Sequence, residues 1–231
     1  LQNTGTTNAT FINTVGNFKF GKSALVNDTT LTIPSFHFSN LLTGSTKSFT
    51  VSFWFKANSI SGTWNILFDV SHYNTAGIRV YINSNNYLYI YYYNSGVSND
   101  YTLALNGNFT DNNWRLYTFV WSYVSNSSDV YTYDLRFYEN SVLNGDVDRQ
   151  VIKSDNANGF QIGDGNPDGA YPNEGYYDDF RIYDKALSAY EIDILANNKI
   201  ENPDYKILTF TYQGPSYPVL DADATNLVTW Y

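Results

Sequence analysis

Tyrosine is concentrated in residues 87–93, where five of seven positions carry it. Side chains alternate between the two faces of a strand, so Leu88, Ile90 and Tyr92 share one face and the remaining tyrosines share the other. The Leu/Ile face is the expected core face, which directs the tyrosine row outward. Flat rings with hydroxyl tips suit the C–H faces and hydroxyl groups of sugars, and tyrosine also favours protein interfaces.

The preceding segment extends this surface. Ile78, Val80 and Ile82 are expected to face inward, and a hairpin through residues 83–86 merges the outer faces of the two strands. We therefore predict a glycan-binding surface made of Arg79, Tyr81, Asn83, Tyr87, Tyr89, Tyr91 and Tyr93. Two alternatives stay open: the row lies under a loop or a neighbouring domain, or it reflects only the preference of tyrosine for strands.

Acidic residues gather in two places. In residues 175–183, alternation puts Asp178 on the same inner face as Phe180 and Ile182, where a carboxylate needs hydrogen-bond donors or a cation. The loop at residues 164–169 offers Asp164 and Asp168 with a turn glycine, which is the first half of a calcium-binding loop. Its second half fails, because Gly175 stands where a glutamate is required. A plain hairpin turn is the alternative for this loop.

Period-2 patterns predict strands near 10–20, 23–33, 48–57, 64–71, 77–83, 87–94, 114–124, 130–138, 150–152, 159–163, 176–183 and 206–212. The predicted helix spans 188–197, because Ser188 and Glu191 form a capping box and Leu187 can pack on Ile192 across it. A chain of 231 residues fits one large all-β domain. These elements favour a two-sheet antiparallel sandwich with one short helix.

Composition excludes several classes of protein. The net charge of −9 argues against nucleic-acid binding, which requires a basic surface. There is no run of about 18 apolar residues, so we expect no membrane insertion. Without cysteine there are neither disulfides nor thiolate metal sites.

Five segments in order resemble one family. They are residues 18–25, 31–34, 49–56 and 111–114, and above all residues 175–192, Gly-Tyr-Tyr-Asp-Asp-Phe-Arg-Ile-Tyr-Asp-Lys-Ala-Leu-Ser-Ala-Tyr-Glu-Ile. They resemble laminin G-like jelly rolls of the concanavalin A-like lectin/glucanase superfamily, over roughly residues 18–197. The resemblance implies a jelly-roll fold. It leaves activity open, since this scaffold carries lectins, adhesion modules, spacers and glycosidases.

The resemblance also implies a structural calcium ion and several packing residues. Many relatives hold calcium through an acidic residue at the position of Asp178 and oxygens near the early strands, where Asp28 lies in a shortened local pattern. A hydrogen-bonded structural role for Asp178 is the alternative. Core packing is expected for the aromatic row Tyr117, Phe119, Trp121 and Tyr123, and packing roles for Trp54 and Trp114.

No catalytic residues are predicted. Retaining glycosidases need two carboxylates about 5 Å apart, and glucanases of this scaffold place two glutamates at positions i and i+4. None of the four glutamates makes that pattern. Asp146 and Asp148 sit beside Asn144–Gly145 in an expected turn, and the two histidines, His37 and His72, have no zinc-site spacing.

The chain ends on residues 226–231, which resemble the first strand of such a domain. We therefore divide the chain into a jelly-roll domain, 1–200, and an additional strand, connector and strand, 201–231. The last strand either completes this domain or belongs to a neighbouring repeat of a tandem array.

The expected function is a non-catalytic recognition or adhesion module that binds a glycan or a surface protein, and neighbouring copies of itself. Its expected location is extracellular, on a cell surface or on a virion. One alternative is a structural repeat of a filament, fibre or virion built by strand exchange between domains. The other is a glycosidase.

Overall fold

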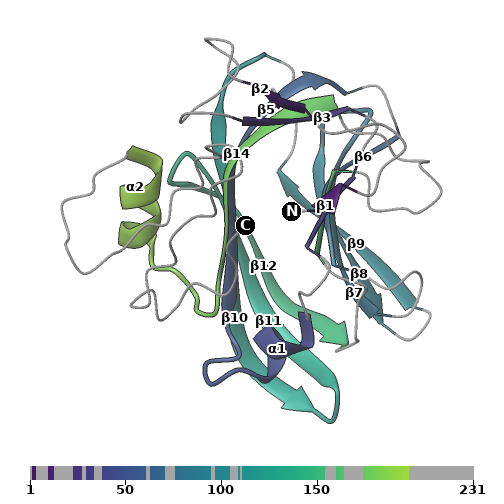
Figure 1. The fold of residues 1–231 in the computed structure, drawn as a ribbon. Coiled ribbons are helices and arrows are strands. Elements are labelled where there is room, and N and C mark those ends of the chain that lie inside the picture. The colour runs from purple at the N-terminus through teal and green to yellow at the C-terminus, as the bar shows by residue number, and fades with distance from the viewer. Residues whose placement is uncertain are drawn as a thin grey trace.

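The computed structural model describes residues 2–3, 10–12, 23–27, 30–33, 38–60, 63–70, 76–94, 97–104, 109, 111–153, 160–163 and 174–197. Within these residues the chain forms two antiparallel sheets and two short helices, arranged as a jelly-roll sandwich (Figure 1). The predicted fold class is therefore confirmed. The predicted strand at 206–212 and the expected division of the chain at residue 200 lie outside the described residues.

Sheet A has seven strands in the order β1-β4-β13-β6-β7-β8-β9. Their bounds are β1 Gln2–Asn3, β4 Thr30–Ile33, β13 Phe160–Gly163, β6 Trp64–Asp69, β7 Ala76–Asn83, β8 Leu88–Asn94 and β9 Val97–Ala104.

Sheet B has seven strands in the order β12-β11-β10-β5-β14-β3-β2. Their bounds are β12 Val142–Lys153, β11 Val130–Glu139, β10 Arg115–Ser127, β5 Phe49–Ser59, β14 Glu174–Tyr183, β3 Ser23–Asn27 and β2 Thr10–Ile12.

The core fills the space between the two sheets and is strongly aromatic. Alternate residues of β5 and β10 point into it, and Phe53 stacks on Phe180 at 5.0 Å between ring centroids while Phe49 stacks on Trp121 at 4.6 Å. Tyr117, Phe119 and Trp121 are buried in this cluster with Tyr123 packed at its edge, as predicted. Described side chains therefore fill the space between the two sheets.

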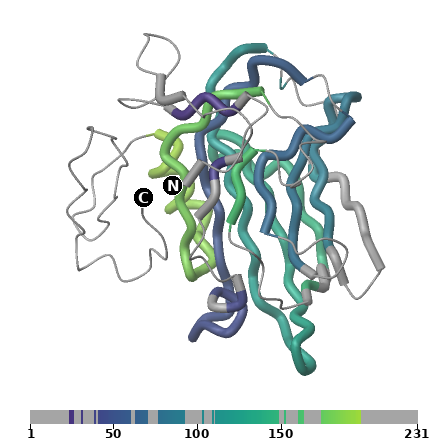
Figure 2. The backbone as a smooth tube through the Cα atoms, turned by 45° about the vertical axis from the view of Figure 1, so that its right-hand side comes forward, coloured from purple at the N-terminus to yellow at the C-terminus, as the bar shows by residue number. Residues whose placement is uncertain are grey.

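Helix α2, Ala189–Asn197, packs on the outer face of sheet B (Figures 1 and 2). Leu187 and Ile192 bury against Val120 and Tyr138 of that face. The predicted capping box is present, since the Ser188 backbone N–H donates to the Glu191 carboxylate at 2.7 Å and the Glu191 N–H donates to Ser188 Oγ at 3.3 Å.

Four elements were not predicted, or only in part, and the shortest of them is β1. Helix α1, Phe38–Thr43, lies at one end of the sandwich (Figure 1), and β9 forms the edge of sheet A. Strand β12 begins at Val142, so the expected turn at Asn144–Gly145 is wrong. The turn falls instead at Asn140 and Ser141, whose positive φ angles of 50° and 69° are those of a tight hairpin turn.

Candidate functional site

The hairpin between β7 and β8 forms as predicted and is closed by Asn83. The Asn83 side-chain Oδ1 accepts hydrogen bonds from the backbone N–H groups of Asn85 (3.0 Å) and Tyr87 (2.9 Å). The Asn83 N–H donates to the Tyr87 carbonyl at 3.0 Å, and Asn86 takes a left-handed φ of 61°. This turn fixes the register in which Tyr81 lies opposite Tyr89.

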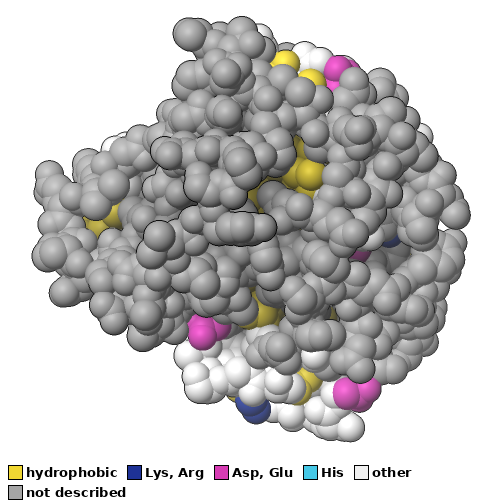
Figure 3. Space-filling view, in the orientation of Figure 1, with side chains coloured by type: hydrophobic (Ala, Val, Ile, Leu, Met, Phe, Trp, Pro, Cys, Tyr) yellow, Lys and Arg dark blue, Asp and Glu magenta, His cyan; other side chains and the backbone are white. Residues whose placement is uncertain are grey.

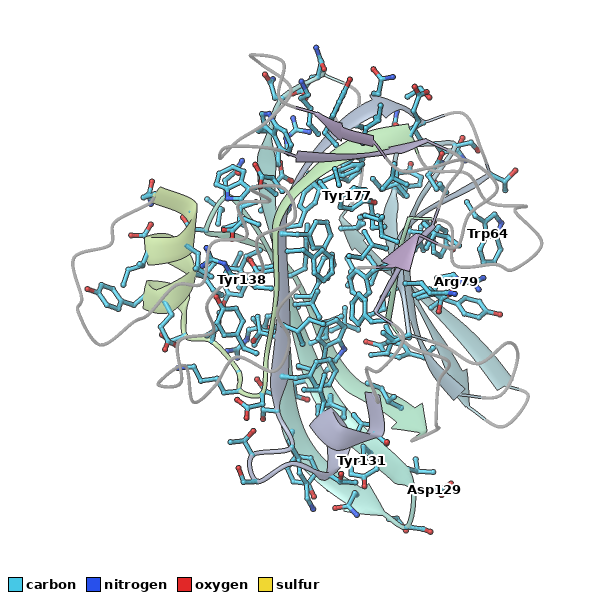
Figure 4. All side chains as sticks on the ribbon, in the orientation of Figure 1. Trp64, Arg79, Asp129, Tyr131, Tyr138 and Tyr177 are labelled. Carbon is cyan, nitrogen blue, oxygen red and sulfur yellow. The ribbon has the colours of Figure 1, made fainter. Side chains whose placement is uncertain are left out.

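The register separates a core face from an outer face. Three residues of β7 (Ile78, Val80 and Ile82) and three of β8 (Leu88, Ile90 and Tyr92) are buried in the core. Their neighbours in sequence point to the outer side of sheet A, where Figure 4 places Arg79 and Trp64. The inward positions predicted from the sequence are therefore confirmed, whereas the outward tyrosine face as a binding surface stays a prediction.

A tryptophan from β6 joins this outer face. The pairing of β6 with β7 shifts register between Ile66 and Phe68, so Trp64 and Phe68 project to opposite faces although they are four residues apart. Trp64 stacks on Tyr81 with ring centroids 4.8 Å apart and an interplanar angle of 16°. Strict alternation from Phe68 places Trp64 in the core, so no sequence signal identified it as a surface residue.

The rings form one connected aromatic surface, which we define as Trp64, Tyr81, Tyr87, Tyr89 and Tyr91. Tyr81 stacks on Tyr89 at 5.3 Å and 9°, and the Tyr87 ring meets Tyr89 edge-on at 6.4 Å. Trp64 also meets Tyr91 at 5.8 Å. Tyr81 lies between two stacked neighbours and is 5% exposed, whereas the other four rings are part-exposed. Tyr81 therefore positions the surface, and its neighbours keep part of their surface exposed.

Arg79, which is predicted to contact a ligand, lies in a buried ion pair. Asp69 lies directly opposite it on β6, and Arg79 Nε contacts Asp69 Oδ2 at 2.6 Å. Both side chains are almost fully buried, at 4% and 1% exposure. A buried guanidinium needs such a partner, because an uncompensated buried charge costs several kcal/mol. The pair thus lies within the outer face as a structural element.

Hydrogen-bonding groups border the rings. The Tyr87 and Tyr89 hydroxyls take part in no hydrogen bond within the described part of the chain, and Asn83 uses only its Oδ1 there, which leaves its amide N–H groups as donors. Tyr93 lies in β8 opposite Gly77, and its side chain is outside the described residues. The surface can thus offer both ring faces and polar groups to a ligand.

The predicted metal ligands are not brought together among the described residues. Asp28, Asp164 and Asp168 fall outside them, and the described side chains include no group of three or more His, Cys, Asp or Glu that could hold a metal ion. Asp178 is buried, but it pairs in register with Trp54, whose side chain is on the outer face of sheet B. The predicted inner-face position of Asp178 is therefore wrong.

A β-bulge explains this correction. The pairing of β14 with β5 shifts between Asp178 and Arg181, and Asp179 has a left-handed φ of 50°. The bulge reverses the alternation, so Phe180 and Ile182 face the core as predicted while Asp178 does not. The structure therefore gives no support to a calcium site built on Asp178 from the inner face, and calcium binding stays a prediction.

Several carboxylates near the strands are held by arginines or by hydrogen-bond donors. Arg115 contacts both Asp111 and Glu139, the latter at 2.9 Å. Arg181 Nη2 contacts Asp179 Oδ2 at 2.6 Å, and the Ser59 hydroxyl donates to Glu174 at 2.8 Å. Each of these side chains is engaged in a contact within the fold, and burial raises the pKa of the Asp179 carboxyl although Arg181 opposes the shift.

Similar folds occur in several solved structures. Botulinum neurotoxin type C, studied for the dependence of its cell entry on two ganglioside molecules, superposes with a TM-score of 0.59 at 16% identity over 85% of this chain and 46% of that one. Domain 4 of AbnA, a GH43 extracellular arabinanase from Geobacillus stearothermophilus, was solved in complex with arabinotriose. It superposes with a TM-score of 0.58 at 19% identity, over 84% of this chain and 87% of that one. The binding domain of Paraclostridial Mosquitocidal Protein 1 superposes with a TM-score of 0.56 at 16% identity, over 87% of this chain and 48% of that one.

This chain thus spans about half of the two toxin chains, and at these identities the likeness concerns the fold alone. No curated protein sequence matches it. In the described residues no helix is long and apolar enough to cross a membrane. A family model, however, matches residues 26–193, which include most strands of both sheets and part of α2. The chain belongs to the laminin G-like family of the concanavalin A-like lectin/glucanases superfamily.

Proposed function

We propose that this protein is a non-catalytic carbohydrate-recognition module that binds its glycan on the aromatic surface of sheet A. The observation that carries the proposal is the stack of Tyr81 between Trp64 and Tyr89, which holds part-exposed rings in place before a ligand arrives. Rings that are already ordered lose little conformational entropy on binding, which favours recognition by a shallow surface.

The comparisons support a binding role in general terms. One similar structure concerns a toxin that interacts with gangliosides, and another is a domain in complex with arabinotriose. A third, the binding domain of botulinum neurotoxin DC, was solved in complex with rat synaptotagmin II, so a surface protein is the alternative kind of partner. These proteins are at most 19% identical in sequence to this chain. Their ligands therefore do not identify the ligand of this chain, which we propose separately.

Two observations favour a binding role over glycoside hydrolysis. The core is filled with aromatic side chains, and Asp111, Glu139 and Asp179 are held by arginines. A retaining glycosidase instead needs two carboxyl groups about 5 Å apart in an open site that admits the sugar.

A shallow surface gives weak binding per module, so we propose that the protein acts extracellularly, on a cell or virion surface, where several copies engage a ligand together. Tandem copies in one chain, or neighbouring copies, supply that multivalency. A structural calcium ion held by Asp178 with Asp28, or by Asp164 and Asp168, is part of the same proposal.

The first test is a glycan array probed with and without EDTA. Binding in both conditions supports recognition by the aromatic surface, whereas binding that EDTA abolishes adds the calcium ion. The absence of binding in either condition contradicts the proposal and favours a structural repeat of a filament or fibre. Cleavage of a labelled oligosaccharide contradicts the non-catalytic assignment.

The second test uses the glycan that binds best on the array. Trp64→Ala and Tyr89→Ala are each expected to weaken its binding by about tenfold or more, the usual loss for a central aromatic contact. The matched control is Tyr190→Ala, which removes a 67% exposed tyrosine from α2, on sheet B. Isothermal titration calorimetry gives the affinities. Equal affinities for all the variants contradict the proposed location of the site.

A further inference from the structure

Charged residues are divided unequally between the two sheets. The strands of sheet A contain a single Lys or Arg, Arg79, with Asp69 and Asp100 as their acidic residues. The whole segment 57–114, which includes β6 to β9 and their connections, has no other Lys or Arg. The strands of sheet B instead carry Lys56, Arg115, Arg136, Arg149, Lys153 and Arg181.

The one cation of sheet A is already committed. Arg79 Nε lies 2.6 Å from Asp69 Oδ2, and both side chains are buried beside the aromatic surface. A guanidinium in this position cannot turn outward without breaking its contact with the buried Asp69 carboxylate, which is costly. The aromatic surface therefore has no exposed cation of its own among the described residues of sheet A.

Among the described side chains, the exposed polar groups that border the rings are neutral. They are the Tyr87 and Tyr89 hydroxyls and the side-chain amide of Asn83, which retains its N–H donors. Hydroxyls and amides suit the hydroxyl groups of a sugar. A carboxylate or sulfate, in contrast, is bound best by charge-assisted hydrogen bonds from Arg or Lys. The net charge of −9 adds a long-range repulsion of anions.

We infer that the aromatic surface selects uncharged glycans and discriminates against those that carry sialic acid, uronic acid or sulfate. This inference rests on the proposed function and specifies the chemical class of its ligand. The discrimination comes from two features together: the only cation of the sheet is buried against a carboxylate, and the rings are bordered by neutral hydrogen-bonding groups.

The test is an array of matched pairs in which each neutral glycan stands beside its charged counterpart, for example lactose beside 3′-sialyllactose and arabinotriose beside a sulfated trisaccharide. We expect the neutral member of a recognised pair to bind at least about tenfold better at low salt, and the ratio to shrink toward high salt as the repulsion is screened. Affinity for the neutral member itself is expected to change little with salt.

A pair of variants locates the effect. Asn85→Lys adds a cation at the exposed turn beside the surface, and Asn144→Lys adds the same charge on β12, in sheet B. Asn85→Lys is expected to raise the affinity for 3′-sialyllactose relative to lactose by about threefold or more at low salt. The attraction of a nearby cation reaches about 10 Å at 0.1 M salt and farther at lower salt before it is screened. Asn144→Lys is expected to leave the ratio unchanged.

The possible outcomes distinguish failure of this inference from failure of the proposed carbohydrate-binding function. Stronger binding of the charged members overturns the inference and leaves the recognition module intact. A lack of binding to every glycan overturns both. Equal shifts from Asn85→Lys and Asn144→Lys show that net charge, rather than the surface, sets the preference, and this result also overturns the inference.

Discussion

Asp179 combines two unusual properties in one residue, because its φ of 50° forms the bulge of β14 and its carboxylate is paired with Arg181. The Arg181 Nε contacts Asp179 Oδ1 at 2.7 Å, and both side chains are more than nine-tenths buried. Asparagine tolerates the left-handed region, so Asp179→Asn keeps the backbone and removes only the charge. We expect it to lower the free energy of unfolding by about 3–5 kcal/mol, since the guanidinium remains buried and uncompensated.

The matched control for this variant is Asp146→Asn, which breaks an exposed pair with Arg136 at 3.4 Å. Urea denaturation should show a loss of no more than about 1 kcal/mol for the control, as is usual for surface ion pairs. Similar losses of unfolding free energy in the two variants would contradict the prediction, because the buried pair of β14 would then stabilise the protein no more than the exposed pair does.

Asp184 gives a prediction about pH. Its Oδ1 is buried with no hydrogen-bond partner among the described residues, and burial raises the pKa of this carboxyl although Lys185 opposes the shift. The folded state thus favours the neutral acid, so this contribution to stability is complete below the pKa of the unfolded chain and is lost as pH rises through the folded pKa. Asp184→Asn should be more stable than the wild type near about pH 7 and equal to it near about pH 3.5. Urea denaturation at both pH values measures the difference, and a constant offset between the proteins contradicts the assignment.

At the scale of elements, β9 and β12 bring an edge of each sheet close together. Gly145 of β12 lies opposite the core residue Phe137, and a Cβ built on it would lie 2.3 Å from the Leu103 carbonyl oxygen of β9. Gly145→Ala therefore forces the two strands apart, and we expect a loss of about 1–3 kcal/mol. The exposed neighbour serves as control in Asn144→Ala. Thermal unfolding shows whether Gly145→Ala destabilises or stabilises the protein. An unhindered Gly→Ala change would stabilise it by about 0.4–1 kcal/mol.

These elements also show what the sequence could predict. Apolar alternation identified β5, β7, β8 and β10, and the Ser188–Glu191 capping box identified α2. Strands β9 and β12 were missed or shortened because edge strands carry polar residues such as Ser98, Asn99 and Asp146, which resemble loops.

The errors in the candidate site have a different physical origin. Bulges leave no signature in the alternation itself, yet each reverses the face of every residue beyond it. Because of the bulge in β14, Asp178 lies on the outer face of sheet B instead of the inner face. Because of the bulge in β6, Trp64 lies on the aromatic surface instead of in the core. The burial of Arg79 depends on Asp69 of a different strand, which local reading of β7 could not reveal.

At the scale of the whole molecule, the sandwich is completed by strands that are distant in sequence. Strand β14 pairs with both β5 and β3, and β13 pairs with both β4 and β6, so residues near 25–33 depend on residues near 160–183. On the face seen in Figure 3, acidic side chains outnumber basic ones on the described surface at the lower end, in keeping with the net charge. The hydrophobic clusters of the described residues run from Ala24 to Leu195.

The extent of these clusters leads to a prediction about the boundary of the domain. A protein truncated after residue 200 retains both sheets and α2, so we expect its melting temperature to stay within about 4 °C of the full chain, which corresponds to about 1 kcal/mol. The control is truncation after Tyr183, which removes α2 and uncovers Val120 and Tyr138; the loss of Leu187 and Ile192 from their cluster should cost several kcal/mol. Differential scanning calorimetry compares the three proteins. If truncation after residue 200 is as damaging as truncation after Tyr183, the strand expected at 226–231 completes this domain rather than a neighbouring one.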